Sequence, residues 1–280
     1  MNRHRLAFFL AAFLAVTPGA AEAQFSLKDL GNLGKSGTGN TTSSGGIGDI
    51  LGQSADDEAS SGAVIAAPVF GAARPWRNAA AQTYVNLVGR NLARQVERKD
   101  VLWRFAILDT PSINAMAFPG GIIVVTRGLY AMLSTEDELA GVLAHEIAHV
   151  NLRHQWNVIQ KQKLIALAGN AVARNDPAQA TKIVADLGAQ LLARGLDKSA
   201  EFEADRAGVV IAARAGYDSS ALITVMEKLK ALPGTADTAM LFSTHPSPQA
   251  RIDALTAAAT PAVEAAAEPS PAAARIRAAH

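Results

Sequence analysis

The chain has 280 residues, with 26 Lys and Arg against 25 Asp and Glu, and this balance excludes the strong basic excess typical of nucleic-acid-binding proteins. It contains no Cys, so disulfides are excluded and any metal site must use His and carboxylate side chains. The length allows one large domain or two small ones.

Residues 1–23 are predicted to be a secretory signal peptide. The basic start MNRHR is followed by the apolar run LAFFLAAFLAV over residues 6–16, which is too short to cross a bilayer. Ala21 and Ala23 then form an A-x-A cleavage pattern before Gln24. The mature protein is expected in a bacterial periplasm, with no transmembrane segment and no nucleic-acid partner, although the signal also permits full export.

Three further regions differ in composition. Residues 24–63 are rich in Gly, Ser, Thr and Asp and are predicted to be a flexible linker. Residues 258–280 are rich in Ala and Pro and are predicted to be a disordered tail. Residues 64–257 are expected to form one domain with its own core.

The domain is predicted to contain a few strands and many helices. Apolar residues at helical spacing predict a helix over 76–98, whereas LWRFAILD (102–109) and GGIIVVT (120–126) are predicted strands. A capping box at Thr135 begins a helix that is predicted to run through His154. Further helices are expected at 157–173, 177–194, 198–214 and 218–230. This order predicts an α+β fold that is mostly helical, with a small sheet.

The helix after Thr135 carries His145, Glu146 and His149 in an H-E-x-x-H pattern. Residues four apart lie on one face of a helix, so the two imidazoles can bind one metal ion. Glu146 is rotated about 100° from His145, where it can act as the general base for an attacking water. Imidazole suits zinc, and catalytic zinc takes three protein ligands, so the pattern predicts one Zn²⁺ per chain and a third ligand elsewhere.

The third ligand is predicted in SAEFEADRAG, residues 199–208. Glu201 and Asp205 are four apart, so one carboxylate can bind zinc while the other accepts an N–H from a ligating His. The alternative is a solvated acidic face without a metal. His154 follows His149 by five residues and is expected to point away from the metal.

Four stretches, in this order along the chain, resemble the gluzincin metallopeptidases related to HtpX and the CAAX prenyl proteases (metallopeptidase family 48). They are INAMAFPGG (113–121), ELAGVLAHEIAHVNLRH (138–154), EFEADRAG (201–208) and STHPSPQARI (243–252). Within that family the chain is most similar to the soluble periplasmic BepA-like branch. It departs from HtpX-type members in having no transmembrane segment after the signal, and from BepA in having no tetratricopeptide array.

The resemblance implies a zincin-like domain with its small sheet next to the H-E-x-x-H helix. It implies a zinc endopeptidase in which His145, His149 and Glu201 are the ligands. It also implies that Glu146 is the base and that Asp205 supports a ligating His from behind.

The sequence allows more than one role for His245 and for the segment that contains Asn114, Gly120 and Gly121. His245 is expected at the active site, either as a donor to the oxyanion or as a fourth zinc ligand that keeps the enzyme latent; a locally packed histidine is the alternative. Asn114, Gly120 and Gly121 are predicted at a sheet edge where an extended substrate adds as a strand. Alternatively, the glycines make a tight turn that Asn114 caps. Arg251 is expected to be structural.

The predicted function is that of a periplasmic zinc metalloendopeptidase that hydrolyses unfolded or misassembled envelope proteins in protein quality control. The substrate class follows from the resemblance, which also leaves the outer-membrane assembly machinery open as a partner. One alternative is a latent or non-catalytic chaperone-like binding protein with the same zinc site. The other is a zinc site that only supports folding.

Overall fold

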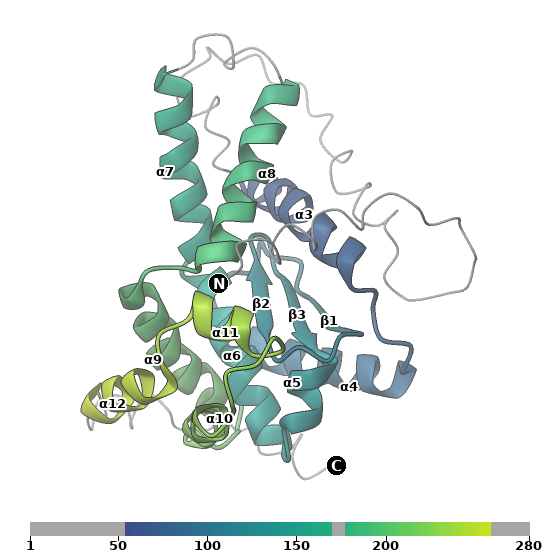
Figure 1. Cartoon of the computed structure of the whole chain (residues 1–280), viewed down its shortest axis with the longest axis vertical. Helices are drawn as coiled ribbons and strands as arrows, with labels where there is room; N and C mark the ends of the chain where they lie inside the picture. Colours follow the sequence, from purple (N-terminus) through teal and green to yellow (C-terminus); the bar gives the residue numbers. More distant parts are fainter. Residues whose placement is uncertain (1–53, 170–176, 259–280) are drawn as a thin grey trace.

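A computed structural model describes residues 54–169 and 177–258 (Figure 1). The predicted signal peptide, the predicted tail beyond residue 258 and most of the predicted linker lie outside the described residues. Within the described ranges, no helix is both long and apolar enough to cross a bilayer. The architecture is α+β and mostly helical with one small sheet, which confirms the predicted fold class.

Helix α6 (Glu136–Asn151) is the central element of the domain. Every residue from Glu138 to Val150 is buried, including the ionisable His145, Glu146 and His149. It packs most extensively against α9 (Lys198–Arg214) and also contacts α4 (Ala79–Ala93), α10 (Ala221–Lys230) and the sheet. The Thr135 side chain accepts the Glu138 N–H, as in the predicted capping box, and the Glu138 carboxylate accepts the Ser134 N–H at 2.7 Å.

The sheet has three strands in the order β1-β3-β2. Strand β1 (Arg104–Leu108) runs parallel to β3 (Ile122–Thr126), and β2 (Ala115–Phe118) runs antiparallel to β3. The two strands predicted from sequence correspond to β1 and β3, whereas β2 was not predicted. Gly120 and Gly121 form the turn between β2 and β3 with φ of 77° and 93°, a region that favours glycine. Because β3 lies between β1 and β2, strand β2 is an edge of the sheet.

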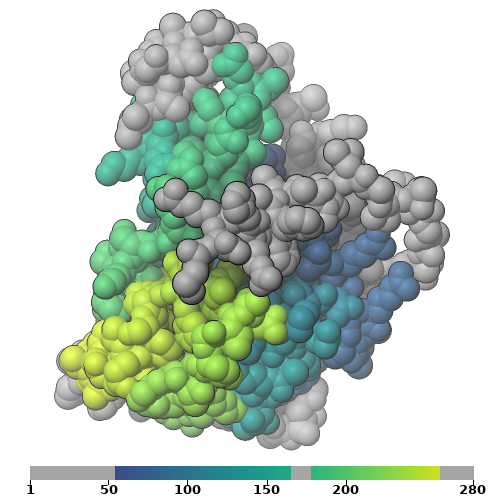
Figure 2. Space-filling model, viewed as in Figure 1, coloured from purple at the N-terminus to yellow at the C-terminus, as the bar shows by residue number. Residues whose placement is uncertain are grey.

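The remaining helices surround α6 and the sheet (Figure 1). They are α3 (Ala55–Ala72), α4 (Ala79–Ala93), α5 (Arg127–Met132), α7 (His154–Gly169), α8 (Pro177–Arg194), α10 (Ala221–Lys230), α11 (Ala239–Thr244) and α12 (Pro248–Ala258). Helices α7 and α8 pack side by side, and in the space-filling view α8 projects above the body of the molecule (Figure 2). Helix α3 packs along α8.

The helix that carries H-E-x-x-H ends earlier than the sequence predicts. Helix α6 stops at Asn151, and Arg153 adopts a left-handed conformation with φ of 58°. Helix α7 then begins at His154 in a new direction. The prediction was wrong because Arg153, rather than Gly or Asn, occupies the left-handed position, and an Arg in this conformation gives no sequence signal.

The linker predicted over residues 24–63 also differs from the structure, since α3 begins at Ala55. Ser54 and Asp57 form a reciprocal capping box at its start. This helix packs against the domain despite its polar start. Gly62 lies so close to the β2–β3 turn that a Cβ would be 1.8 Å from the Pro119 oxygen.

A buried ion pair holds α3 to the rest of the domain. Glu58 is 1% exposed, and its carboxylate lies 2.9 Å from Nη2 of Arg98. It also accepts the backbone N–H of Gly120 at 3.4 Å. Arg98 donates to the carbonyl of Val150 at 3.2 Å, at the end of α6. The pair therefore joins α3, the β2–β3 turn and the end of the central helix.

Replacement of Glu58 by Ala is expected to lower the free energy of unfolding by about 3 kcal/mol, since it removes one partner of a buried pair. Urea unfolding followed by circular dichroism measures the change. Asp56→Ala, an exposed change in the same helical turn, is the matched control and should stay within about 0.5 kcal/mol. Equal effects of the two changes would mean that the pair does not anchor α3.

Candidate active site

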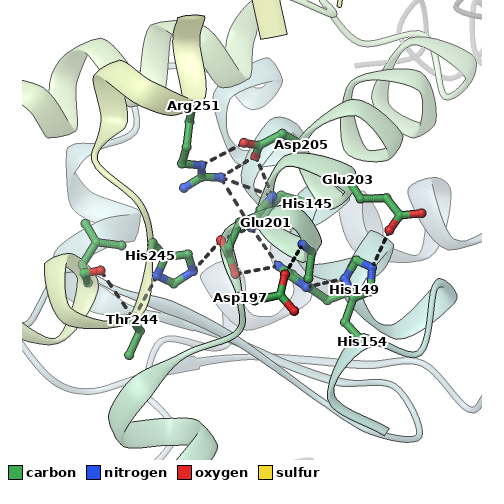
Figure 3. Close-up of polar contacts among 12 residues, drawn as sticks. His145, His149, His154, Asp197, Glu201, Glu203, Asp205, Thr244, His245 and Arg251 are labelled. Carbon is green, nitrogen blue, oxygen red and sulfur yellow. Dashed lines mark hydrogen bonds and ion pairs between the residues drawn. The ribbon is translucent and has the colours of Figure 1, made fainter. Parts of the chain in front are cut away.

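Three segments bring ionisable side chains together in the interior (Figure 3). Helix α6 contributes His145, Glu146 and His149, helix α9 contributes Glu201, and the residue after α11 is His245. The first four of these residues are between 2% and 5% exposed. The sequence-predicted metal residues are thus brought together in one place.

Small residues make the close approach of α6 and α9 possible. A Cβ on Gly208 of α9 would lie 2.9 Å from the backbone nitrogen of His145. Ala144 and Ala148 on α6 and Ala204 on α9 are all fully buried. The Ala-rich composition of both helices therefore has a direct structural consequence, because larger side chains would hold the ionisable groups apart.

The Glu201 carboxylate is surrounded by three imidazole nitrogens. Its oxygens lie 3.7 Å from Nε2 of His145, 3.5 Å from Nε2 of His149 and 3.6 Å from Nε2 of His245. The Nε2 atoms of His145 and His149 are 3.1 Å apart. Ligand atoms about 2.0–2.2 Å from a tetrahedral zinc are separated by roughly 3.3–3.6 Å, so these spacings resemble a zinc ligand set.

One buried atom supports a metal at this point. Oε2 of Glu201 is inaccessible and has no hydrogen-bond partner in the structure. Burial raises the pKa of Glu201 to about 8, whereas a cation bound beside it would favour the ionised form. His145, Glu201 and His245 each offer one donor atom within 4.8 Å of the others. The described residues therefore fit a zinc ion.

His145 is oriented by Asp205 from α9. Its Nδ1 lies 2.9 Å from Oδ1 of Asp205, so an Nδ1–H donated there leaves the Nε2 lone pair for a metal. Burial raises the pKa of Asp205, but the adjacent Arg251 guanidinium outweighs it and holds that pKa well below its usual range. Arg251 is itself buried and binds both Asp205 oxygens, and its Nη2 also lies 3.2 Å from Nδ1 and 3.4 Å from Nε2 of His145. Asp205 thus lies where the sequence predicts.

His149 is oriented by a residue that sequence reasoning did not recognise. Its Nδ1 lies 3.0 Å from Nδ1 of His154, and Nε2 of His154 lies 3.4 Å from the Glu203 carboxylate. If His154 donates to Glu203, its Nδ1 accepts from His149, and Nε2 of His149 keeps its lone pair. His154 therefore contacts the proposed ligand His149 at Nδ1, the ring nitrogen that does not face Glu201. The left-handed turn at Arg153 places it there, and helical spacing alone gives no signal for it.

His245 is oriented by its neighbour. The Thr244 hydroxyl donates to the carbonyl of Met240 at 2.8 Å, and it lies 2.9 Å from Nδ1 of His245. With its proton used, the hydroxyl accepts from Nδ1–H, so Nε2 of His245 also presents a lone pair. Burial, with Arg251 nearby, lowers the pKa of His245 to about 3, so its imidazole is neutral. Three different acceptors thus leave a lone pair at each Nε2, and Nε2 of His145 also lies 3.4 Å from Nη2 of Arg251 and 3.1 Å from Nε2 of His149.

Glu146 and the edge strand border an open cleft of about 620 Å³, a volume that includes its mouth. Burial raises the pKa of Glu146 to about 8, and the backbone amide of Ala117 opposes this rise, so strand β2 lies beside the carboxylate. The cleft is also lined by Asn114, whose buried Oδ1 has no partner. Gly120 and Gly121 do not line it and form the tight turn instead. The proposed substrate edge therefore shifts from the two glycines to β2.

Comparison with known proteins relates this arrangement to a family. The profile described as Peptidase family M48 matches residues 79–259. The chain is 32% identical over 172 residues to the mitochondrial metalloendopeptidase OMA1 of Schizosaccharomyces pombe, covering 60% of this chain and 50% of that protein.

A second relative is the beta-barrel assembly-enhancing protease of Escherichia coli (strain K12), 30% identical over 182 residues. The protein of the same description from Yersinia pestis is 31% identical over 187 residues. Both alignments cover 60% of this chain and 37% of the relative. The chain thus spans half or less of the length of these curated relatives.

Replacement of His154 by Ala is expected to weaken zinc binding about 10- to 100-fold, because the His149 ring loses the acceptor that orients it. His154→Asn keeps an acceptor and should recover part of the loss. Competition with a chromophoric chelator measures both affinities. Asn157→Ala, an exposed change on the same helix, serves as control. Full zinc affinity in His154→Ala would rule out the orienting role.

Proposed function

The chain belongs to peptidase family M48, and from this membership we propose that it is a zinc-dependent endopeptidase. The observation that carries the proposal is the buried donor set around Glu201, with an unpartnered carboxylate oxygen at its centre. A buried Glu146 lies next to this set in a cleft that is open to solvent. His145, His149 and Glu201 are the proposed ligands, and Asp205 and His154 orient the two imidazoles.

In the proposed reaction, zinc and Glu146 have separate chemical roles. Zinc bound here would polarise the scissile carbonyl and acidify the attacking water. Glu146 takes a proton from that water and passes it to the leaving amine. Burial raises the pKa of its carboxyl to about 8, and zinc bound beside it would lower that pKa toward the neutral range that suits a general base.

His245 is proposed to hold the resting enzyme latent. Its Nε2 lies 3.6 Å from Glu201, within the donor set. Its Nδ1 lies 2.9 Å from the Thr244 hydroxyl, whose own proton goes to the Met240 carbonyl, and this favours the Nδ1–H tautomer. A neutral ring in this tautomer presents a lone pair at Nε2 and has no proton to donate to an oxyanion there. Of the two active-site roles for His245, the fourth ligand is therefore the better supported, and substrate must displace it.

Substrate is proposed to bind as an extended strand along β2. Thr126 N–H donates to the Asn114 carbonyl, so by alternation Ala115 and Ala117 turn their backbone groups away from β3. An added strand pairs with the backbone groups of Ala115 and with the Ala117 carbonyl, since the Ala117 amide faces Glu146, and the unpartnered Oδ1 of Asn114 offers one more acceptor. Such binding recognises an extended backbone with free hydrogen-bonding groups, which unfolded proteins expose and folded domains do not.

The cellular setting is part of the same proposal. The predicted signal peptide over residues 1–23 supports a periplasmic location. Two of the relatives are beta-barrel assembly-enhancing proteases, which supports unfolded or misassembled envelope proteins as substrates in protein quality control, and outer-membrane assembly as the place of action. The peptidase domain is proposed to include α3, and so to begin near Ser54 rather than residue 64.

The change Glu146→Gln is expected to abolish proteolysis while zinc binding persists, because it removes the base but none of the proposed ligands. Mature protein of each kind is loaded with zinc and incubated with unfolded casein, with and without a chelator. We expect wild type or the His245→Ala variant to cleave casein, and we expect the chelator to stop this cleavage. We expect no cleavage when either protein also carries Glu146→Gln. Equal cleavage with and without Glu146→Gln would refute the assignment.

The change His245→Ala is expected to raise the rate of casein cleavage at least about 10-fold, since it opens the fourth position of the metal. Thermal unfolding of both proteins controls for a change in stability. If His245 instead donated to the oxyanion, the same change would lower the rate about 10²- to 10³-fold. The sign of the effect therefore separates latency from oxyanion stabilisation.

A further inference from the structure

Basic residues are concentrated in one short stretch of the chain, away from the candidate active site. Residues 74–104 contain seven Lys and Arg side chains against two acidic ones, Glu97 and Asp100. The whole chain has 26 basic and 25 acidic residues, so this excess is balanced elsewhere. The stretch covers helix α4 and the start of strand β1. The positive charge is therefore a local property of one part of the fold.

Helix α4 exposes one of its faces to solvent. Ala80, Thr83, Leu87, Arg90 and Arg94 are all exposed, and their spacing of three and four residues places them on one side of the helix. The helix itself contains no acidic residue. In the part of the chain that the structure describes, neither Arg90 nor Arg94 forms an ion pair or a side-chain hydrogen bond. Their guanidinium charges are therefore available to a partner.

Two exposed leucines accompany these arginines. Leu102 is 61% exposed and Leu87 is 54% exposed, the two highest values for large apolar side chains within residues 54–169 and 177–258. Single exposed leucines are common on protein surfaces, but these two occur in the same stretch as the excess of basic residues. An apolar side chain next to several cationic ones is the combination found on surfaces that bind membranes.

The pairing of α4 with β1 places the leucines and the arginines on the same part of the surface. Nε2 of Gln82 donates to the Ile107 carbonyl, and Nδ2 of Asn86 donates to the Phe105 carbonyl, each at 2.8 Å. The helix therefore runs antiparallel to the strand beside it (Figure 1). One helical turn advances about as far as two residues of extended chain, so positions 90 and 94 lie level with positions 103 and 101. Leu102 lies between those two positions.

The remaining charged groups of the stretch leave this surface positive. Lys99 is exposed, and its Nζ lies 2.7 Å from the Val96 carbonyl at the end of α4. Asp100 is neutralised by Arg98, whose Nη2 lies 2.9 Å from its carboxylate. Within residues 74–104, all of which the structure describes, Glu97 is the one acidic side chain without an ion pair. It does not balance the surrounding cations.

We propose that the surface formed by Leu87, Arg90, Arg94, Lys99 and Leu102 docks on the anionic face of a phospholipid bilayer. The cationic side chains bind headgroup phosphates, which a guanidinium matches with two parallel hydrogen bonds. The two leucines enter the boundary between headgroups and acyl chains. An acidic protein fits this surface less well, because a stable protein interface needs about 800 Å² on each partner, whereas separate side chains suffice for insertion among lipids.

Docking at this surface keeps the candidate active site accessible. Strands β1 and β2 are opposite edges of the sheet, since β3 lies between them. The cleft beside Glu146 is lined by β2, whereas the proposed docking surface adjoins β1. A bilayer bound through α4 therefore leaves the β2 edge open. The inference goes beyond the proposed peptidase function, and either one can fail without the other.

Cosedimentation with vesicles tests the proposal. The full-length mature protein, without residues 1–23, is loaded with zinc and mixed with vesicles of phosphatidylcholine alone or with about 30% phosphatidylglycerol. It is expected to bind the anionic vesicles at least about 10-fold more tightly, and added salt should reduce the difference. Equal binding to both vesicles, or binding to neither, would overturn the proposal. Retention on a poly-glutamate column without vesicle binding would also overturn it and would indicate an acidic protein partner.

Substitutions assign the binding to the α4 surface. Arg90→Ser combined with Arg94→Ser is expected to weaken binding to the anionic vesicles about 25-fold, or about 5-fold for each charge removed. Leu87→Ser should weaken it about 5-fold, because an inserted apolar group is lost. The matched control, Lys161→Ser combined with Lys182→Ser, removes the same charge from exposed positions on α7 and α8 and should change binding less than about 2-fold.

Thermal unfolding of each variant shows that it is folded, and casein cleavage should stay at the level of the parent protein, since no substituted residue lies in the candidate site. Unchanged vesicle affinity in the folded double arginine variant would refute the assignment. Equal losses in the double arginine and double lysine variants would also refute it, because binding would then follow total charge rather than this surface.

Discussion

The close packing of α6 against α9 is the constraint on which the site depends. Both helices carry ionisable side chains on the faces that meet, and water is excluded between them. A buried charge without a partner costs several kcal/mol, so these groups must satisfy one another or hold a cation. Gly208 and the buried alanines bring the backbones close enough for this to happen. Larger residues at those positions would separate His145 from Glu201 and Asp205.

Orientation of the imidazoles draws on more of the fold than the H-E-x-x-H helix. His145 is paired with Asp205 on α9, His149 with His154 at the start of α7, and His245 with Thr244 at the end of α11. Each acceptor leaves Nε2 of its partner directed toward Glu201. The end of α8 packs closely against Thr244, because a Cβ on Gly195 would lie 1.9 Å from the Thr244 backbone oxygen. The segment that carries His245 is therefore positioned by the same helix that forms one wall of the cleft.

Helix α3 shows how composition can conceal structure. Its sequence, ADDEASSGAVIAAPVFGA, begins with the polar residues of a linker, yet Glu58 is among the most buried side chains of the domain. The buried ion pair with Arg98 and the close contact at Gly62 fix the helix on the sheet. These contacts in turn place Ile65 in the cleft. A segment outside the family-matched residues thereby becomes part of the candidate site.

The fold class, the strands β1 and β3 and the family can be predicted from the sequence alone, since these follow from local periodicity and from motifs of short spacing. It also pointed to His145, Glu146, His149, Glu201 and Asp205, because four-residue spacing on a helix defines a shared face. Other features depend on contacts between distant segments and follow only from the folded structure. The left-handed turn at residue 153, the acceptor role of His154, the edge strand β2 and the burial of α3 all arise this way. None has a local pattern, because each is specified by the element that packs against it.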